Sequence, residues 1–376
     1  MLAQSGERLK IVGKRGVGSL PENQNGVRPR VEKRGCAGVR RRELRLEARE
    51  RVLFVERMAT FDERQRAEYR EQFQRDGFVV LEGYFSSERV DALCAEVERL
   101  LRERPLEVVV DSRVTGQRAW WADTPYRDTL RFKFNDLYLM SDLVREIALD
   151  APLSGLLAEL MGEAPVLCNS LNFRKGSTDH VHIDSLFMTP RTPGALAATW
   201  TALEDVHPDA GPLTYFRGSH RVPLYRFSDG SHHAIRSEMP AWLDYIKEQL
   251  RERGIEEQVF LAKKGDVFIW HSDLVHSGSP IRDLRRTRTS LVCHYYGEAD
   301  ARAMGSDLVA RNSGYWLRRL PQAVLVAPEV FAAGREFPEA QYLARYPDVK
   351  GAVEAGAFAS GWAHYEACGF KEGRGI

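Results

Sequence analysis

Cysteine is scarce in this sequence, and long apolar runs are missing. Five of the 376 residues are cysteines, at positions far apart: Cys36, Cys94, Cys168, Cys293 and Cys368. An odd number of scattered cysteines argues against a disulfide framework and a cysteine-based zinc site, so we expect reduced thiols. No run approaches the ~18 apolar residues of a membrane helix, and the N-terminus lacks the apolar core of a secretory signal. We therefore predict a cytoplasmic protein that does not bind membranes.

Charge of one sign is also missing overall, with 54 Lys and Arg against 53 Asp and Glu. The balance conceals an asymmetry, because residues 1–57 hold 15 Lys and Arg against 7 Asp and Glu, and the remainder carries a net charge of −7. We predict that residues 1–57 are a disordered basic extension and that the rest of the chain binds no nucleic acid. A clean amphipathic pattern begins at Met58, so one hypothesis places the true start of translation there. A basic targeting or nucleic-acid arm is the competing interpretation.

Helical patterns surround a short strand after Met58. The spacing over residues 60–76, with Gly77 as C-cap, predicts a helix, and Phe78–Leu81 predicts a buried strand. Ser86 begins a second predicted helix that ends near Arg104. Two more helices are expected, over residues 143–161 and 240–253.

Short strands dominate from about residue 165 to 296, where β-branched and aromatic residues are punctuated by Gly, Pro, Asp and Asn. About eight such strands predict a mostly β fold with flanking helices and a jelly-roll core, whose mouth would form a concave site. We expect this domain to span residues 58–300. A linker over 301–336 and a small helical module over 337–376 would follow, and the module would dock on the core or bind a partner.

The motif His182-Ile183-Asp184 carries the strongest chemical signal. Residues two apart in a strand project from one face, so an imidazole and a carboxylate at this spacing can bind one ion from one side. His276 is the best candidate for a third ligand. Two His and one carboxylate leave three positions of an octahedron open, as in non-haem Fe(II) oxygenases. His180 and His271 are rivals for the two imidazole positions.

The order of the motifs resembles the phytanoyl-CoA dioxygenase family of Fe(II)- and 2-oxoglutarate-dependent oxygenases. The resemblance covers about residues 72–298 and rests on Gly77–Phe85, His182–Asp184, Thr199–Leu203, Asp209–Leu213, Arg217–His220, Lys264–His271, Val275–Pro280 and Arg288–Tyr296. It implies a double-stranded β-helix (cupin-like) domain over 58–300. It also implies a hydroxylase acting on a small molecule or an acyl or sugar conjugate, with release of succinate and CO2. The implied cofactors are Fe(II), 2-oxoglutarate as cosubstrate and O2, with ascorbate as a reductant.

The resemblance also assigns roles to single residues. His182 is favoured over His180 because His180 would move the carboxylate out of the pair. The resemblance favours His276 over His271, because the family's Arg follows its distal His by about a dozen residues. Arg288 would then receive the distal carboxylate of 2-oxoglutarate, which a guanidinium binds in bidentate fashion. Four further residues match positions that contact the cosubstrate: Trp200, Asn172, Lys133 and Ser279. Trp200 would also serve as a core aromatic, and Lys133 as a solvated charge.

Other functions stay open at this point. A non-catalytic, cupin-like binding protein would have a structural metal or none, and an enzyme of the same fold with Mn or Zn would be a hydrolase or isomerase. The combination of His, Asp, His and Arg argues against both. Halogenating relatives have a small residue at the position of Asp184, so the carboxylate implies hydroxylation. The C-terminal tail resembles a short helical module of bacterial proteins that often have glycan-related partners.

Overall fold

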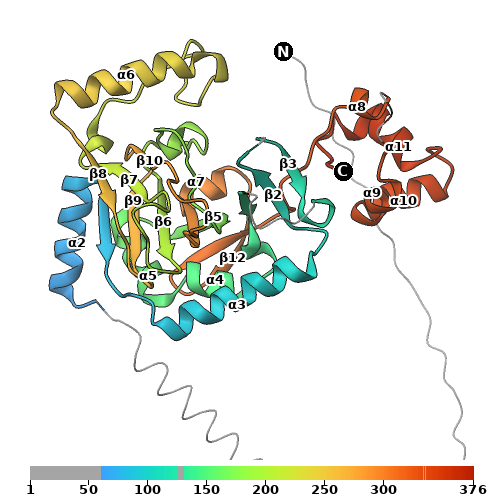
Figure 1. Ribbon diagram of the computed structural model, residues 1–376. Coiled ribbons are helices and arrows are strands. Elements are labelled where there is room, and N and C mark those ends of the chain that lie inside the picture. The colour runs from blue at the N-terminus through green and yellow to red at the C-terminus, as the bar shows by residue number, and fades with distance from the viewer. Residues whose placement is uncertain (1–60, 115, 125–130, 333, 335) are drawn as a thin grey trace, which may run out of the picture. The chain divides into compact units, whose positions relative to one another are not determined.

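The computed structural model describes residues 61–376 except 115, 125–130, 333 and 335 (Figure 1). The chain divides into two units, Met1–Met58 and Ala59–Ile376, and all the described residues belong to the second. The predictions for the basic extension and for a start at Met58 lie outside the described residues. The finer domain boundaries stay a prediction.

Two sheets make up the β structure of the described residues. The larger contains β1 (Phe78–Leu81), β2 (Val109–Ser112), β3 (Arg118–Trp120), β4 (Phe132–Asn135), β5 (Pro165–Phe173), β6 (Leu196–Ala202), β9 (Val267–His271), β11 (Ser290–Gly297), β12 (Asp307–Arg311) and β13 (Gly314–Arg318). Its strand order is β1-β9-β6-β11-β5-β4-β2-β3, with β13 beside β5 and β12 beside β13. The smaller sheet has the order β10-β7-β8, from β7 (Leu213–Phe216), β8 (Glu257–Phe260) and β10 (His276–Gly278). Every pairing is antiparallel except that of β13 with β5, so the predicted mostly β class is confirmed.

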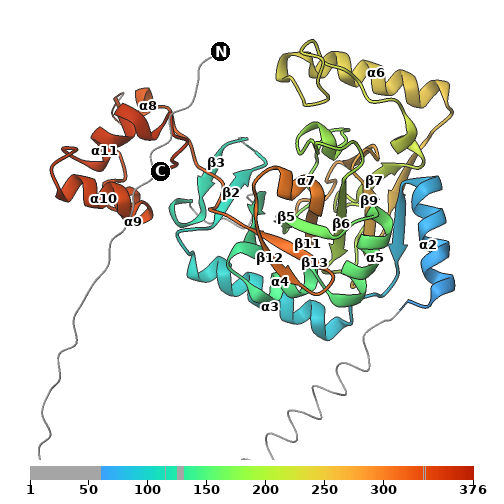
Figure 2. The ribbon, with the colours of Figure 1, turned by 180° about the vertical axis from the view of Figure 1, so that it is seen from behind.

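The helices agree with the sequence patterns, with one difference. The predicted helices are α2 (Glu63–Asp76), α3 (Ser87–Glu103) and α6 (Met239–Glu252), and Gly77 ends α2 in the left-handed conformation. The single helix expected over 143–161 is two helices, α4 (Asp142–Ala148) and α5 (Ala151–Met161). Pro152 explains the break, since its ring would clash with the carbonyl of Ala148 in a continuous helix and has no N–H to donate. In both ribbon views α3 lies at the bottom and α6 at the top, with the strands between them (Figures 1 and 2).

The larger sheet has two buried faces, which separate core from site. On β11, Leu291, Cys293 and Tyr295 pack into a cluster with apolar residues of α3, α4 and α5. Val292 points to the other face, where it packs with Trp270 and with residues of the smaller sheet. Because successive side chains of a strand alternate between faces, even-numbered residues of β11 face the smaller sheet. The cavity that contains the predicted metal ligands lies on this second face.

The C-terminal helices pack on the β2–β3 hairpin. They are α8 (Pro328–Ala332), α9 (Glu339–Arg345), α10 (Pro347–Glu354), α11 (Gly361–His364) and the π-helical turn Tyr365–Gly369. Tyr342 and Tyr365 share an apolar cluster with Val109 and Trp120. The guanidinium of Arg345 stacks on the ring of Trp120, 3.4 Å from its centroid. These contacts agree with the expected docking of this module on the core.

Candidate metal and cosubstrate site

The three predicted metal ligands come together from two segments of the chain. His182 lies in the connection between β5 and β6, and His276 is the first residue of β10. Their backbones form an isolated antiparallel bridge in which each N–H donates to the other's carbonyl, both at 3.0 Å. The bridge therefore fixes the two imidazoles side by side, with ring centroids 4.2 Å apart.

Asp184 does not sit on the continuous strand that the sequence predicts. Ile183 is extended, but Asp184 begins a 3-10 turn, Asp184–Leu186, and Phe187 N–H donates to its carbonyl. The strand is cut short because its pairing with β10 is a single bridge at His182. The turn still brings the carboxylate to the imidazoles. The two groups therefore lie together as expected, but strand alternation is not what places them there.

The ligand atoms are oriented for one ion. The Nε2 atoms of His182 and His276 lie 3.8 and 3.7 Å from Oδ1 of Asp184, and candidate ligand atoms of all three residues lie within 4.8 Å of one another. The Nδ1 atoms are 2.6 Å from the carbonyl of His180 and 2.9 Å from that of Leu274. Since a carbonyl only accepts, Nδ1 carries the hydrogen in both rings and Nε2 is free to bind a metal.

The charges of these groups suit a metal ion as well. Burial opposes ionisation of Asp184, but the imidazoles of His276, His294 and His182 outweigh it and hold the pKa of this carboxyl well below its ordinary range. Burial, reinforced by His182, lowers the pKa of His276 to about 4. At neutral pH the site therefore offers a carboxylate and a neutral imidazole, which are the states that bind metal.

Arg288 lies in the same cavity, of about 840 Å³, as the three ligands. It is only 2% exposed, and its guanidinium stacks against Trp200 and Phe173, 5.6 and 6.0 Å from the ring centroids. Nη1 donates to the carbonyl of Gly211 at 3.1 Å, whereas Nε has no hydrogen-bond partner among the described residues. Burial lowers the pKa of Arg288 to about 10, so the group stays charged at neutral pH. A buried cation without a carboxylate is costly, and an anionic ligand would remove that cost.

Two other predicted cosubstrate contacts line this cavity. Trp200 does so, and its Nε1 is buried without a partner in the described part of the chain. Lys133 on β4 lies directly across from Phe173 and has its Nζ 3.2 Å from Oδ2 of Asp111. Trp200 and Lys133 therefore belong to the cavity wall that contains Arg288.

The structure does not bring Asn172 and Ser279 to this wall. The strand neighbours of Asn172, Leu171 and Phe173, both line the cavity, so alternation turns Asn172 to the opposite face. Ser279 does not line the cavity; the serine that does is Ser277 on β10, whose Oγ is 2.6 Å from Oγ1 of Thr214.

The rival residues occupy other places. His271 lies away from the ligands, with its ring 5.5 Å from that of His220. His180 takes part through its backbone carbonyl, which accepts from Nδ1 of His182. Arg285 and Arg286 are both exposed and pair with Asp283.

Sequence reasoning missed two side chains that contact Asp184. Trp270 donates from Nε1 to Oδ2 of Asp184 at 2.7 Å, and Nε2 of His294 lies 3.6 Å from the same oxygen. The signal for His294 was available in the alternation of β11, because Val292, His294 and Tyr296 all line the cavity. Trp270 stands on β9 two residues from Phe268, on the face that packs toward the smaller sheet.

Comparison with known proteins places this site in a family. The model of the family described as phytanoyl-CoA dioxygenase (PhyH) matches residues 73–289, more than half of the chain. The peroxisomal phytanoyl-CoA dioxygenase of Rattus norvegicus is 25% identical over 251 residues, covering 62% of this chain and 69% of the relative. The ectoine dioxygenase of Bordetella bronchiseptica is 28% identical over 158 residues, covering 40% and 48%. The chain thus spans about half to two thirds of the length of these two relatives.

Solved structures show weaker likenesses. The epimerase SnoN, in complex with Fe3+, alpha ketoglutarate and nogalamycin RO, has a TM-score of 0.48 at 20% identity, over 69% of this chain and all of that one. EctD from S. alaskensis with bound Fe has a TM-score of 0.46 at 20% identity, over 65% and 79%. Both likenesses are too weak to bear on function.

The match to the family model tests two predictions, the family of this chain and its enzyme class. In the part of the chain that the structure describes, no helix combines the length and apolarity that crossing a bilayer requires. The name of the rat relative gives the peroxisome, and the cytoplasmic location expected for this chain stays a prediction. The predicted class, a dioxygenase, is confirmed, since the chain belongs to the phytanoyl-CoA dioxygenase family.

Proposed function

We propose that this protein is an Fe(II)- and 2-oxoglutarate-dependent dioxygenase that hydroxylates a small molecule or an acyl or sugar conjugate, releasing succinate and CO2. One observation carries the proposal. Two free imidazole Nε2 atoms and one carboxylate oxygen converge in a cavity that also contains a buried guanidinium without a carboxylate partner among the described residues. The two sheets would form the double-stranded β-helix of the family, with this cavity between them.

The roles of the residues follow from their positions. His182, Asp184 and His276 would hold the iron on one side and leave three coordination positions toward the cavity. Arg288, helped by Lys133, would bind the far carboxylate of 2-oxoglutarate, and the faces of Trp200 and Phe173 would keep water from that ion pair. Iron, when bound, would supply the activation of O2 that is coupled to decarboxylation of the cosubstrate.

The rest of the cavity indicates an amphipathic substrate. Phe187 is 56% exposed, lies with its ring 6.0 Å from that of His182, and lines the cavity together with Met188 and Met239. Arg118 also lines the cavity, and its Nε lies 2.7 Å from Oδ1 of Asp111. We infer a substrate with an apolar part against Phe187 and a polar or anionic part toward Arg118.

Succinate formation tests the proposal. The protein would be purified under nitrogen and supplied with Fe(II), ascorbate, 2-oxoglutarate and O2, since such enzymes form some succinate without their substrate. We expect His182→Ala and Asp184→Ala to reduce succinate to background while thermal unfolding stays cooperative. His207→Ala, in an exposed loop, is the matched control. Wild-type turnover in either ligand variant would overturn the assignment, and binding of 2-oxoglutarate without turnover would favour a cupin-like binding protein.

A further inference from the structure

A second group of candidate metal ligands lies in the C-terminal helices, at the red end of the chain in Figure 1. His364, Cys368 and Glu372 each offer one ligand atom, and the three atoms lie within 4.8 Å of one another. None of these three residues lines the cavity that contains the candidate iron ligands. Imidazole nitrogen, thiolate sulfur and carboxylate oxygen are the ligands that zinc takes in proteins. The group is therefore a candidate zinc site separate from the site in the cavity.

A regular helix would not bring the first and the third of these ligands together. Each residue of an α-helix turns the chain by about 100°, so residues eight positions apart lie about 80° out of line. The turn Tyr365–Gly369 is π-helical, and the N–H of Phe370 donates to the carbonyl of Tyr365, five residues back, at 2.9 Å. This wider turn reduces the angle, so His364 and Glu372 share one face. Such turns are rare and occur frequently at functional sites.

The imidazole of His364 has the orientation of a metal ligand. It is 5% exposed, and its Nδ1 lies 3.0 Å from the hydroxyl oxygen of Tyr342, a fully buried residue. Metal-bound imidazoles commonly donate the hydrogen of their second nitrogen to an oxygen in this way, which leaves Nε2 free for the ion. Nε2 lies 4.0 Å from Oε2 of Glu372, too far for a hydrogen bond. Two ligands of one zinc ion lie about 3.3 Å apart, since bonds of ~2.0 Å meet at tetrahedral angles, so small side-chain movements would close the site.

The charges around the group balance when a divalent cation is bound. Arg374 lies 2.7 Å from Oε2 of Glu372 and 2.7 Å from Oδ2 of Asp348, so one guanidinium serves two carboxylates and the three charges sum to −1. Zn²⁺ adds +2, and loss of the thiol proton of Cys368 adds −1, which brings the sum to zero. A carboxylate has about four lone pairs, so Glu372 can keep Arg374 and bind the ion as well.

We propose that His364, Cys368 and Glu372 bind one zinc ion, with water as the fourth ligand, and that the ion stabilises the C-terminal helices. The ion would join the end of α11 to the last turn of the chain, where the N–H of Ile376 donates to the carbonyl of Val324 at 2.9 Å. Small modules often depend on a structural metal, because their apolar core is limited. Only one of the three ligands is a cysteine, so the scarcity of cysteine in the sequence does not exclude the site. The inference is independent of the proposed iron site.

Zinc stoichiometry of the full chain, after treatment with a chelator, tests the binding. The candidate iron site also takes up zinc, because two imidazoles and a carboxylate suit both metals. We therefore expect two zinc ions per chain in wild type, one in His182→Ala, one in Cys368→Ser and none in the double variant. In the His182→Ala background, Glu372→Gln should raise the Kd for zinc about tenfold or more. Glu366→Gln, at an exposed residue of the same π-helical turn, is the matched control and should leave this Kd unchanged.

Cobalt tests whether the cysteine is a ligand. A thiolate bound to Co(II) absorbs strongly in the near ultraviolet, whereas a site of two imidazoles and a carboxylate does not. We expect this absorption in wild type and in His182→Ala, and its loss in Cys368→Ser. Cys94→Ser, at a half-buried cysteine of α3, is the matched control and should keep the absorption.

Limited proteolysis tests the stabilising role of the ion. In the His182→Ala background, zinc should slow cleavage within residues 337–376 about fivefold or more, because an ion that binds only the folded module lowers the population of its unfolded form. This protection should disappear when Cys368→Ser is added. Thermal melts show whether each variant is folded, and the changes to Ser and Gln keep the size of the side chains.

Three results would overturn the proposal. They are a wild-type chain that binds no zinc beyond the ion lost in His182→Ala, a cobalt–thiolate absorption that survives Cys368→Ser, and cleavage within residues 337–376 that zinc does not slow. Failure of the proposed iron site has a different signature, since wild type would then bind one zinc ion that His182→Ala keeps and Cys368→Ser loses.

Discussion

The two ends of the cavity differ in how well their polar atoms are satisfied. At the metal end, Nδ1 of His182 and His276 and Oδ2 of Asp184 all have hydrogen-bond partners, and only the atoms that would touch an ion are free. At the other end, Nε of Arg288 and Nε1 of Trp200 are buried without partners within the described residues. The end that would hold the metal is thus preorganised by the protein itself, whereas the end at Arg288 would be completed by a ligand.

Among the substitutions that test this difference between the two ends, Arg288→Met should have the largest effect. Arg288→Met removes the cation that would bind the far carboxylate of 2-oxoglutarate, so the Kd for this cosubstrate should rise about 100-fold or more. Without ligand, the same change removes a buried charge that makes no ion pair within the described residues, so the melting temperature should rise, by ~2–4 °C per kcal/mol gained. Titration with 2-oxoglutarate checks the increase in Kd, and thermal melts check the increase in melting temperature. Arg285→Met, at an exposed residue, is the control. A lower melting temperature would contradict the view that this end lacks a partner.

An intermediate effect is expected from pH at the metal end. In metal-free protein His276 takes up a proton near pH 4, whereas in the unfolded chain it does so near its ordinary pKa of ~6.5. The unfolded state therefore binds more protons between these values, and the free energy of unfolding should fall by about 3 kcal/mol as the pH drops through this window. The stabilising contribution of Asp184 is lost only at still lower pH, because its folded pKa is depressed.

Urea unfolding of chelator-treated protein at several pH values measures this dependence. His276→Gln should flatten the curve between pH 6.5 and 4, while His207→Ala should keep it. If the free energy of unfolding changes equally with pH in wild type and His276→Gln, the account is contradicted, because burial would then not keep the His276 imidazole neutral.

The smallest effect is expected at Asn172. Because the alternation of β5 turns this side chain away from the cavity, Asn172→Leu should change the Michaelis constant for the cosubstrate less than about twofold. Both of its amide atoms are buried without partners among the described residues, so the apolar side chain should also raise stability by about 1 kcal/mol. Steady-state kinetics and urea unfolding measure the two effects. A Michaelis constant raised tenfold or more would instead restore the role that the sequence assigned to Asn172.

The residues that sequence could place are those in contiguous motifs. The motifs that contain His182, Asp184, His276 and Arg288 can be recognised from their order along the chain, without the three-dimensional structure. Asn172 and Ser279 were harder, because a shift of one residue along a strand moves a side chain to the other face without changing the local pattern.

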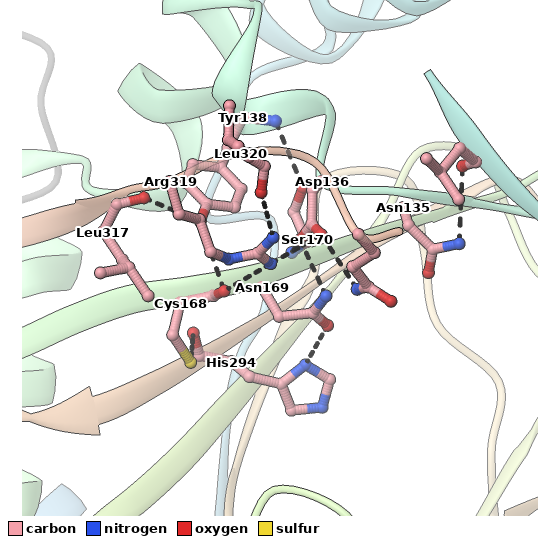
Figure 3. A network of polar contacts seen from close by, with 12 residues as sticks. Asn135, Asp136, Tyr138, Cys168, Asn169, Ser170, His294, Leu317, Arg319 and Leu320 are labelled. Carbon is pink, nitrogen blue, oxygen red and sulfur yellow. Dashed lines mark hydrogen bonds and ion pairs between the residues drawn. The ribbon is translucent and has the colours of Figure 1, made fainter. Parts of the chain in front are cut away.

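Other features depend on contacts between distant segments. The 3-10 turn at Asp184 follows from a bridge with β10, and the position of His294 beside Asp184 follows from the pairing of β11 with β5 and β6. The ion pair between Asp136 and Arg319 (Figure 3) joins residues 183 positions apart, which no local pattern indicates.

A crystal structure obtained under nitrogen with Fe(II) and 2-oxoglutarate tests the central claim most directly. We predict iron bound by Nε2 of His182, Nε2 of His276 and Oδ1 of Asp184, with the far carboxylate of 2-oxoglutarate on the guanidinium of Arg288. Iron on other residues, or a cosubstrate that leaves Arg288 unpaired, would contradict the account.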